Sequence, residues 1–376
     1  MIRVSKSTIT DLDKQAVLKV LDKEFLGMGS EVLNFEKKLE YFFGRDVACV
    51  VNGTAAIQLA IQSCGIKSGD EIIVPSLSYV ACFQAITANN AIPVPCDINL
   101  NTLNIDIEDL KKKITKKTKI IIILHYGGSV AQVEDIYKVS KKYKIRVIED
   151  AAHAFGTVYK KKKIGSFGDI ICFSFDGIKN ITSGEGGCVV SSDKKIIERI
   201  KNYRLLGIVK ESAYRYKNKR NWNYQVDNQG WRYHMSNIMA AIGNQQLKRF
   251  KLISNKRKSL AYRYFLLLRN NPYIKIIQKD FKNVVPHIFV IKLDRLINRK
   301  KIQLYLKNCN IETGVHWKPN HMLNFFKSKN CRLVNTEEVF DKILTLPLHL
   351  DLKISDVDYI CKCLIKSISL FHEKKG

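Results

Sequence analysis

Lys179 stands between two apolar segments and is the residue with the clearest chemical potential in the chain. Segments 170–175 and 187–191 are predicted to be buried strands, and a glycine-rich turn at 184–187 lies between the lysine and the second strand. Lysine is rarely buried unless it is paired or reactive. A lysine fixed between strand ends of an α/β chain is a candidate for Schiff-base chemistry with a carbonyl group.

Asp150 ends another apolar segment, 145–150, and His153 follows three residues later. A carboxylate at the end of a buried strand needs a partner. Asp150 could cap the following turn. It could instead pair with the pyridine nitrogen of pyridoxal phosphate, if that cofactor is present, and so let the ring accept electrons from a carbanion. His153 could then reach the phenolate oxygen of the ring, or make an ordinary hydrogen bond.

Thr54 and Ala55 stand at the start of a predicted helix, directly after Gly53. Free backbone N–H groups and the helix dipole make such a start a seat for phosphate, and glycine allows a close approach. An ordinary helix cap is the alternative. Ser174 could add a hydroxyl to the seat. Tyr79 could stack on a flat cofactor or pack in the core.

Strand-like and helical patterns alternate through the first half of the chain. Strands are predicted at 47–51, 71–75, 91–96, 119–124, 145–150, 170–175 and 187–191, and helices at 55–63, 79–88, from 105 onward, and at 133–143. This alternation favours a mostly parallel sheet covered on both faces. Ligands of such sheets bind at the carboxyl ends of the strands, where the polar residues above are expected to converge.

The second half of the chain has a different pattern. A long helix is predicted over 236–267, a strand-like run over 284–293, a helix over 300–307 and a final helix from about Ser355. The chain length of 376 residues suits two units. We therefore predict a large α/β domain over residues 1–250 and a smaller α+β domain over 251–376.

The composition is strongly basic, with 63 basic and 35 acidic side chains and a net charge of +28. Such an excess could indicate nucleic-acid binding. The lysines are spread along the chain, however, which favours a solvated surface and attraction of an anionic small molecule such as a diphosphate-linked substrate. The apolar fraction of 46% is sufficient for a full core.

The ten cysteines include no C-x-x-C pair, and several lie in apolar runs. The N-terminus has no signal-peptide pattern, and no run reaches the ~18 apolar residues of a membrane span. We expect reduced, buried thiols, no metal, no membrane association and a cytoplasmic location.

Seven motifs occur in the order found in a known family. They are 52–56 (NGTAA), 69–76 (GDEIIVPS), 149–153 (EDAAH), 165–169 (GSFGD), 173–187 with Lys179, 313–319 (TGVHWKP) and 344–347 (LTLP). With these motifs the chain resembles the nucleotide-sugar aminotransferases of the DegT/StrS type over nearly its whole length. The resemblance implies pyridoxal phosphate as cofactor and the aspartate aminotransferase-like PLP-transferase fold (fold type I).

The resemblance also implies roles for individual residues. Lys179 matches the lysine that carries the cofactor as a Schiff base, and Asp150 matches the partner of the pyridine nitrogen. His153 falls near the ring hydroxyl, and Tyr79 matches the stacking aromatic residue. The residues that match phosphate contacts are Thr54, Ala55 and Ser174. The family works as a homodimer, in which each active site is completed by the neighbouring subunit.

The chain departs from the family pattern at two places. Arg232-Tyr233-His234 stands where the family often has Asn-Tyr-Arg, in the loop that reaches the partner's cofactor phosphate. Arg232 could make that contact as a charge-assisted hydrogen bond. Asp176-Gly177 stands where the family commonly has a histidine. Some relatives carry histidine in place of the lysine and act as dehydratases, and Lys179 argues against that activity here.

The implied reaction transfers an amino group from L-glutamate to C4 of a 4-keto-6-deoxy nucleotide sugar, for a surface polysaccharide or another glycan. Amination at C3 is the alternative within the family. His316 and His321 are candidates for the sugar-nucleotide side, or plain loop residues. A non-catalytic regulator that binds nucleic acid on the same fold is the alternative from another class, and a binding module would need neither Lys179 nor Asp150.

Overall fold

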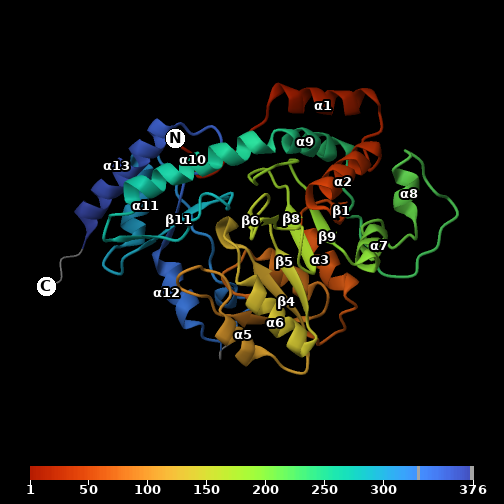
Figure 1. Cartoon of the computed structure of the whole chain (residues 1–376), viewed down its shortest axis with the longest axis horizontal. Coiled ribbons are helices and arrows are strands. Elements are labelled where there is room, and N and C mark those ends of the chain that lie inside the picture. Colours follow the sequence, from red (N-terminus) through yellow and green to blue (C-terminus); the bar gives the residue numbers. More distant parts are fainter. Residues whose placement is uncertain (328–330, 373–376) are drawn as a thin grey trace.

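A seven-stranded sheet forms the centre of the protein in this computed structural model, which describes residues 1–327 and 331–372 (Figure 1). In spatial order its strands are β1 (Asp46–Val50), β9 (Gly187–Ser191), β8 (Ile170–Ser174), β5 (Arg146–Asp150), β4 (Thr118–Leu124), β2 (Glu71–Pro75) and β3 (Ile92–Cys96). β9 is antiparallel to both of its neighbours, and the other neighbouring pairs are parallel. The predicted mostly parallel sheet is confirmed.

Helices cover both faces of this sheet because its strands are apolar on both sides. In β1, Ala48 and Val50 pack into one core cluster, whereas Val47 and Cys49 pack into another on the opposite face. The helices that belong to this part of the chain are α1 (Asp11–Asp22), α2 (Ser30–Phe43), α3 (Gly53–Ser63), α4 (Ala81–Thr87), α5 (Ile107–Lys113), α6 (Val133–Tyr143), α7 (Lys194–Tyr203), α8 (Glu211–Arg215) and α9 (Asn237–Lys248). Smaller elements are the 3-10 turn Tyr126–Gly128 and the hairpin of β6 (Val158–Tyr159) and β7 (Lys162–Lys163).

The long helix predicted over 236–267 is two helices, α9 and α10 (Phe250–Leu268), which was not foreseen. Arg249 between them leaves helical geometry, with φ −97° and ψ 11°. Its guanidinium contacts Asp13 and the carbonyl of Thr8, and the ring of Phe250 packs where a side chain at Gly156 would otherwise stand. Tertiary contacts therefore interrupt a segment whose local pattern is continuously helical.

The residues after α9 form a second, smaller layer around an antiparallel three-stranded sheet. Its strands are β10 (Ile274–Ile276), β11 (Phe289–Leu293) and β12 (Ile343–Leu346), with β11 in the middle. The predicted strand at 284–293 is shorter, because residues 284–288 lead into β11 without pairing in this sheet. The remaining elements are α11 (Arg299–Asn308), the 3-10 turn Asn320–Met322, α12 (Val334–Lys342) and α13 (Ile354–Phe371).

A separate core cluster of residues from Leu260 to Ile368 holds this smaller layer together. The N-terminal segment joins the same layer: Ile2 bridges Ile311, and the carbonyl of Val4 accepts the N–H of Leu348 at 3.0 Å. The division at residue 250 stays a prediction. The prediction assigns the N-terminal residues to the first domain, but Ile2 and Val4 pack against the second.

The ten cysteines are all free thiols, and seven of them are buried. In the described ranges, no helix combines the length and apolarity that a membrane crossing would need.

Candidate active site

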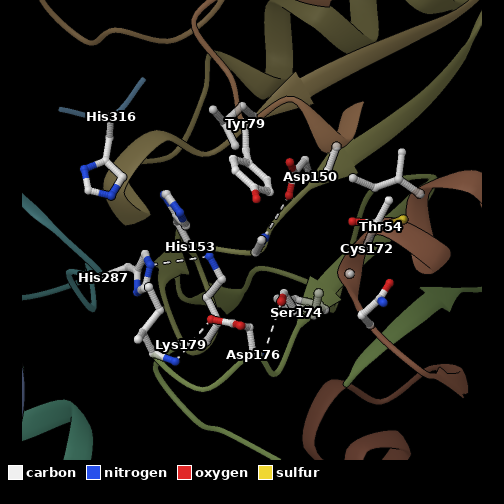
Figure 2. Close-up of a pocket in the computed structure, with 18 of the residues that line it drawn as sticks. Thr54, Tyr79, Asp150, His153, Cys172, Ser174, Asp176, Lys179, His287 and His316 are labelled. Atoms are coloured by element: carbon white, nitrogen blue, oxygen red, sulfur yellow. Dashed lines mark hydrogen bonds between the residues drawn. The ribbon is translucent and has the colours of Figure 1, made fainter. Parts of the chain in front are cut away.

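The carboxyl ends of β1, β5 and β8 meet at one edge of the sheet and border a cavity of about 480 Å³. Register pairs Asp150 with Cys172, Ser174 with Gly187, and Gly187 with Val50. A side chain at Gly187 would stand 2.6 Å from the Asn52 carbonyl oxygen, so glycine lets the strand ends come together. Figure 2 shows side chains from these separate segments directed into the same space.

Seven of the ten predicted site residues line this cavity. They are Thr54, Tyr79, Asp150, His153, Ser174, Lys179 and His316. Ala55, Arg232 and His321 lie outside it. The structure therefore brings together the predicted Schiff-base lysine, the residues predicted to contact the cofactor ring, and two of the predicted phosphate contacts, Thr54 and Ser174.

Lys179 lies in the turn that follows β8, where its N–H donates to the Asp176 carbonyl at 3.0 Å. Its Nζ is 3.5 Å from His287 Nε2. Burial lowers the pKa of the Lys179 amine, and the nearby Asp150 and Asp176 carboxylates only partly oppose that effect. The uncharged amine, which is the nucleophilic form, is therefore easier to reach than in an exposed lysine.

Asp150 is held by hydrogen bonds to both carboxylate oxygens and is 5% exposed. Oδ1 accepts the Ala152 N–H at 3.1 Å, and Oδ2 accepts the Cys82 thiol at 3.2 Å. Burial raises the pKa of Asp150, while these donors and the Lys179 charge act in the opposite direction. A protonated ring nitrogen in the cavity would favour the ionised carboxylate further.

Three imidazoles line the same cavity and are uncharged near neutral pH. Burial lowers the pKa values of His153 and His287 well below the ordinary value, and it lowers the pKa of His316 to about 4. His153 Nδ1 accepts the N–H of Gly127 at 3.3 Å, which leaves Nε2 as its N–H donor. His153 can therefore donate to an oxygen in the cavity without bringing a positive charge.

The start of α3 forms the other end of the cavity, and its residues fit a phosphate. Helix geometry leaves the first-turn N–H groups without intrahelical acceptors. Asn52 Oδ1 accepts the N–H of Ala55 at 2.8 Å, so Asn52 caps the helix, whereas the side chain of Thr54 lines the cavity. Ser174 Oγ accepts the Asp176 N–H at 3.3 Å and keeps its own O–H free to donate. Of the two alternatives foreseen for this turn, the cap is present at Asn52, and the phosphate seat stays a prediction.

His321 and Arg232 occupy different environments from the cavity residues. His321 is buried, with Nδ1 2.7 Å from Ser76 Oγ and Nε2 3.2 Å from Glu337, so its ring holds the Asn320–Met322 turn in place. This geometry gives no support to a substrate role for His321. Arg232 is exposed. Its segment lies beside the end of β1, where His234 forms an antiparallel bridge with Val50.

Sequence reasoning missed His287, Cys82 and Trp317 as site residues. His287 lies on the segment before β11 and had no motif to mark it, and Trp317 was part of a quoted motif without a role. The rings of Trp317 and His153 are 5.1 Å apart. Cys82 lies in the first turn of α4, three residues after Tyr79, and no motif marked it.

Replacing Cys82 with alanine is expected to weaken cofactor binding about fivefold, because Asp150 Oδ2 loses its buried donor, a loss of about 1 kcal/mol. Cys82→Ser keeps a donor and should retain most of the affinity. Equilibrium dialysis of pyridoxal phosphate measures both, with Cys64→Ala, outside the cavity, as the control. Equal affinities for the alanine and serine variants would show that the thiol does not support Asp150.

A lysine and a carboxylate at the carboxyl edge of a mostly parallel sheet, with a helix start for phosphate, define a pyridoxal phosphate enzyme of the aspartate aminotransferase fold. The sequence matches the DegT/DnrJ/EryC1/StrS aminotransferase family over residues 7–365. The chain therefore belongs to this family, and its cofactor is pyridoxal phosphate.

Three relatives illustrate the match. SpsC, a spore coat polysaccharide biosynthesis protein of Bacillus subtilis, is 33% identical over 361 residues, which cover 93% of this chain and 92% of SpsC. PseC of Helicobacter pylori, an aminotransferase involved in pseudoaminic acid biosynthesis, is 29% identical with a TM-score of 0.91, covering 98% of this chain and 100% of PseC. Spr1654 of Streptococcus pneumoniae, in its PMP form, is 26% identical with a TM-score of 0.92, covering 99% of this chain and 100% of Spr1654.

Proposed function

We propose that the protein transfers the amino group of an amino acid, L-glutamate, to C4 of a 4-keto-6-deoxy nucleotide sugar. The product would serve the synthesis of a surface polysaccharide or another glycan. Family membership and the sugar-related roles in the names of SpsC and PseC support this substrate class. The observation that carries the proposal is the presence of Lys179 and Asp150 in one cavity.

Pyridoxal phosphate, when bound, supplies a carbonyl for the lysine amine and a ring that accepts electrons from the substrate carbon. Lys179 would hold the cofactor and, once its amine is free, would move a proton between the amino donor's Cα and the cofactor's reacting carbon. Burial lowers the pKa of Lys179, which favours the uncharged amine that can accept a proton. The keto sugar would receive the amine by the same proton movements in reverse order.

The other cavity residues would orient the cofactor. Asp150 would hold the ring nitrogen in its protonated form, and the Nε2–H of His153 would donate to the ring oxygen. Tyr79, whose side chain is exposed at the cavity, would cover the ring face. Thr54 and Ser174 would hold the phosphate with neutral donors, and the helix start adds its dipole.

The sugar side of the site would lie at His316 and Trp317. His316 is fixed by a 2.8 Å contact between Nδ1 and Thr345 Oγ1, and its uncharged ring can bind sugar hydroxyls. The indole of Trp317 lies next to Tyr79, with ring centroids 6.2 Å apart. An aromatic surface of this kind suits the apolar face of a sugar ring.

A homodimer would complete the site, with Arg232 reaching the cofactor phosphate of the partner subunit. Arg232→Ala is then expected to weaken pyridoxal phosphate binding about tenfold, because a charge-assisted hydrogen bond is lost. Equilibrium dialysis measures the affinity and sedimentation confirms that the variant is still dimeric. Arg220→Ala, an exposed arginine of the same region, is the control. Unchanged affinity in Arg232→Ala would remove this residue from the site.

The substrate is tested by incubating the protein with glutamate and a panel of keto-sugar nucleotides that carry the ketone at C4 or C3. Product masses and NMR assignment of the new amine identify the reaction. A 4-amino product supports the proposal. A product aminated at C3, or amination of none of the nucleotide sugars, would contradict it.

A further inference from the structure

Arg257 on α10 is a buried cation without a carboxylate partner among the described residues. Its side chain is 2% exposed, and burial lowers its pKa to about 10. Nε has no hydrogen-bond partner among those residues. A buried charge without a counter-charge is costly, and apolar replacements of buried ionic groups are often neutral or stabilising. The arginine therefore suggests a functional requirement rather than a stabilising one.

The guanidinium of Arg257 contacts backbone carbonyls from three separate segments. One nitrogen, Nη1, donates to the carbonyl of His287 at 3.1 Å and to that of Leu348 at 3.4 Å. The other, Nη2, donates to the carbonyl of Ile178 at 3.4 Å. Ile178 directly precedes Lys179, and the His287 ring is the group that contacts Lys179 Nζ. Arg257 thus holds the backbone of His287 and of the residue that precedes Lys179.

The charges around Lys179 come from several elements. Asp150 at the end of β5 and Asp176 after β8 favour a charged amine, whereas Arg257 on α10 disfavours it. The imidazoles of His153, His287 and His316 face the same space and are uncharged. Among the described neighbours of Lys179, Arg257 is thus a permanent cation that opposes the two carboxylates. A neighbouring cation is one of the general ways in which a protein activates a lysine.

We propose that Arg257 is a positioning residue for Lys179: its guanidinium fixes the Ile178–Lys179 turn against His287 and places a positive charge near the amine. The inference rests on the proposed role of Lys179 as the residue that binds pyridoxal phosphate. Through Arg257 on α10, the smaller C-terminal layer would then influence the charge state of the active-site lysine.

The test measures how fast the cofactor-free full chain captures pyridoxal phosphate at a series of pH values. Borohydride trapping and peptide mapping restrict the signal to Lys179. Arg257→Gln removes the charge but keeps donors, so the midpoint of the pH profile should rise by about one unit, and capture at neutral pH should be about tenfold slower. Arg257→Lys keeps the charge and should retain the parent midpoint. Asp176→Asn should shift the midpoint in the opposite direction.

Arg263→Gln is the matched control, because Arg263 is on the same helix but is only half-buried and is paired with Asp358. Its midpoint should equal that of the parent. Arg257→Met carries the same expected rise and replaces Arg257→Gln if that variant does not fold by circular dichroism. An unchanged midpoint in the neutral variants, or an equal rise in Arg257→Lys, would overturn the proposal. Absence of capture at Lys179 in the parent protein would instead reject the role of Lys179 itself.

Discussion

Replacement of Lys179 by alanine is expected to reduce amino transfer by about 10⁴-fold or more. General acid–base catalysis by one residue contributes about 10²–10⁴-fold, and Lys179 would also provide the covalent link to the cofactor. The imidazoles of the cavity cannot replace it, because they form no stable imine. Amino-group transfer from glutamate, followed by mass spectrometry of the products, measures the loss.

Lys258→Ala is the matched control for this variant. Burial also lowers the pKa of Lys258, but its Nζ donates to the Lys282 carbonyl at 2.7 Å and does not line the cavity. Its activity should stay within about twofold of the parent, as is usual for a surface substitution with a small free-energy effect. Turnover near the parent level in a correctly folded Lys179→Ala protein would contradict the assignment.

Asp150→Asn is expected to lower turnover on the order of 10³-fold, a loss typical of removing one preorganised electrostatic group from an active site. Asparagine can still accept the Ala152 N–H, so the fold around β5 should persist, but it cannot stabilise a protonated ring nitrogen. Turnover measured with saturating cofactor separates this effect from weaker binding. The ¹⁵N chemical shift of labelled pyridoxal phosphate reports directly whether the ring nitrogen is protonated.

Asp135→Asn provides the control, because Asp135 is an acidic residue of α6 that forms an exposed pair with Lys138. It should leave both turnover and the ¹⁵N shift unchanged. A protonated ring nitrogen in Asp150→Asn, together with turnover within a few-fold of the parent, would show that another group holds the ring.

The part of the site that the sequence predicts follows from strand geometry. Asp150 ends an apolar run, and Thr54 and Lys179 follow within about four residues of one. Strands that run in the same direction end at the same edge of a sheet. The alternation of runs and helices was therefore enough to place these residues together, and the structure confirms that they line one cavity.

The rest of the site depends on contacts that no local pattern encodes. His287 meets Lys179 across 108 residues, and Arg257 reaches the same turn from a helix assigned to the other domain. The break at Arg249 likewise comes from Asp13 and Thr8, more than 230 residues earlier. Periodicity predicts which face of an element is buried, but not which distant element covers it.

The most direct test of the central claim is to locate the covalent bond between protein and cofactor. Freshly reconstituted protein would be reduced with borohydride, digested and mapped by mass spectrometry. The structure predicts a single pyridoxyl-modified peptide, labelled at Lys179, and no label after prior incubation with excess glutamate. A label at another lysine, or no label in protein that holds the cofactor, would contradict the account.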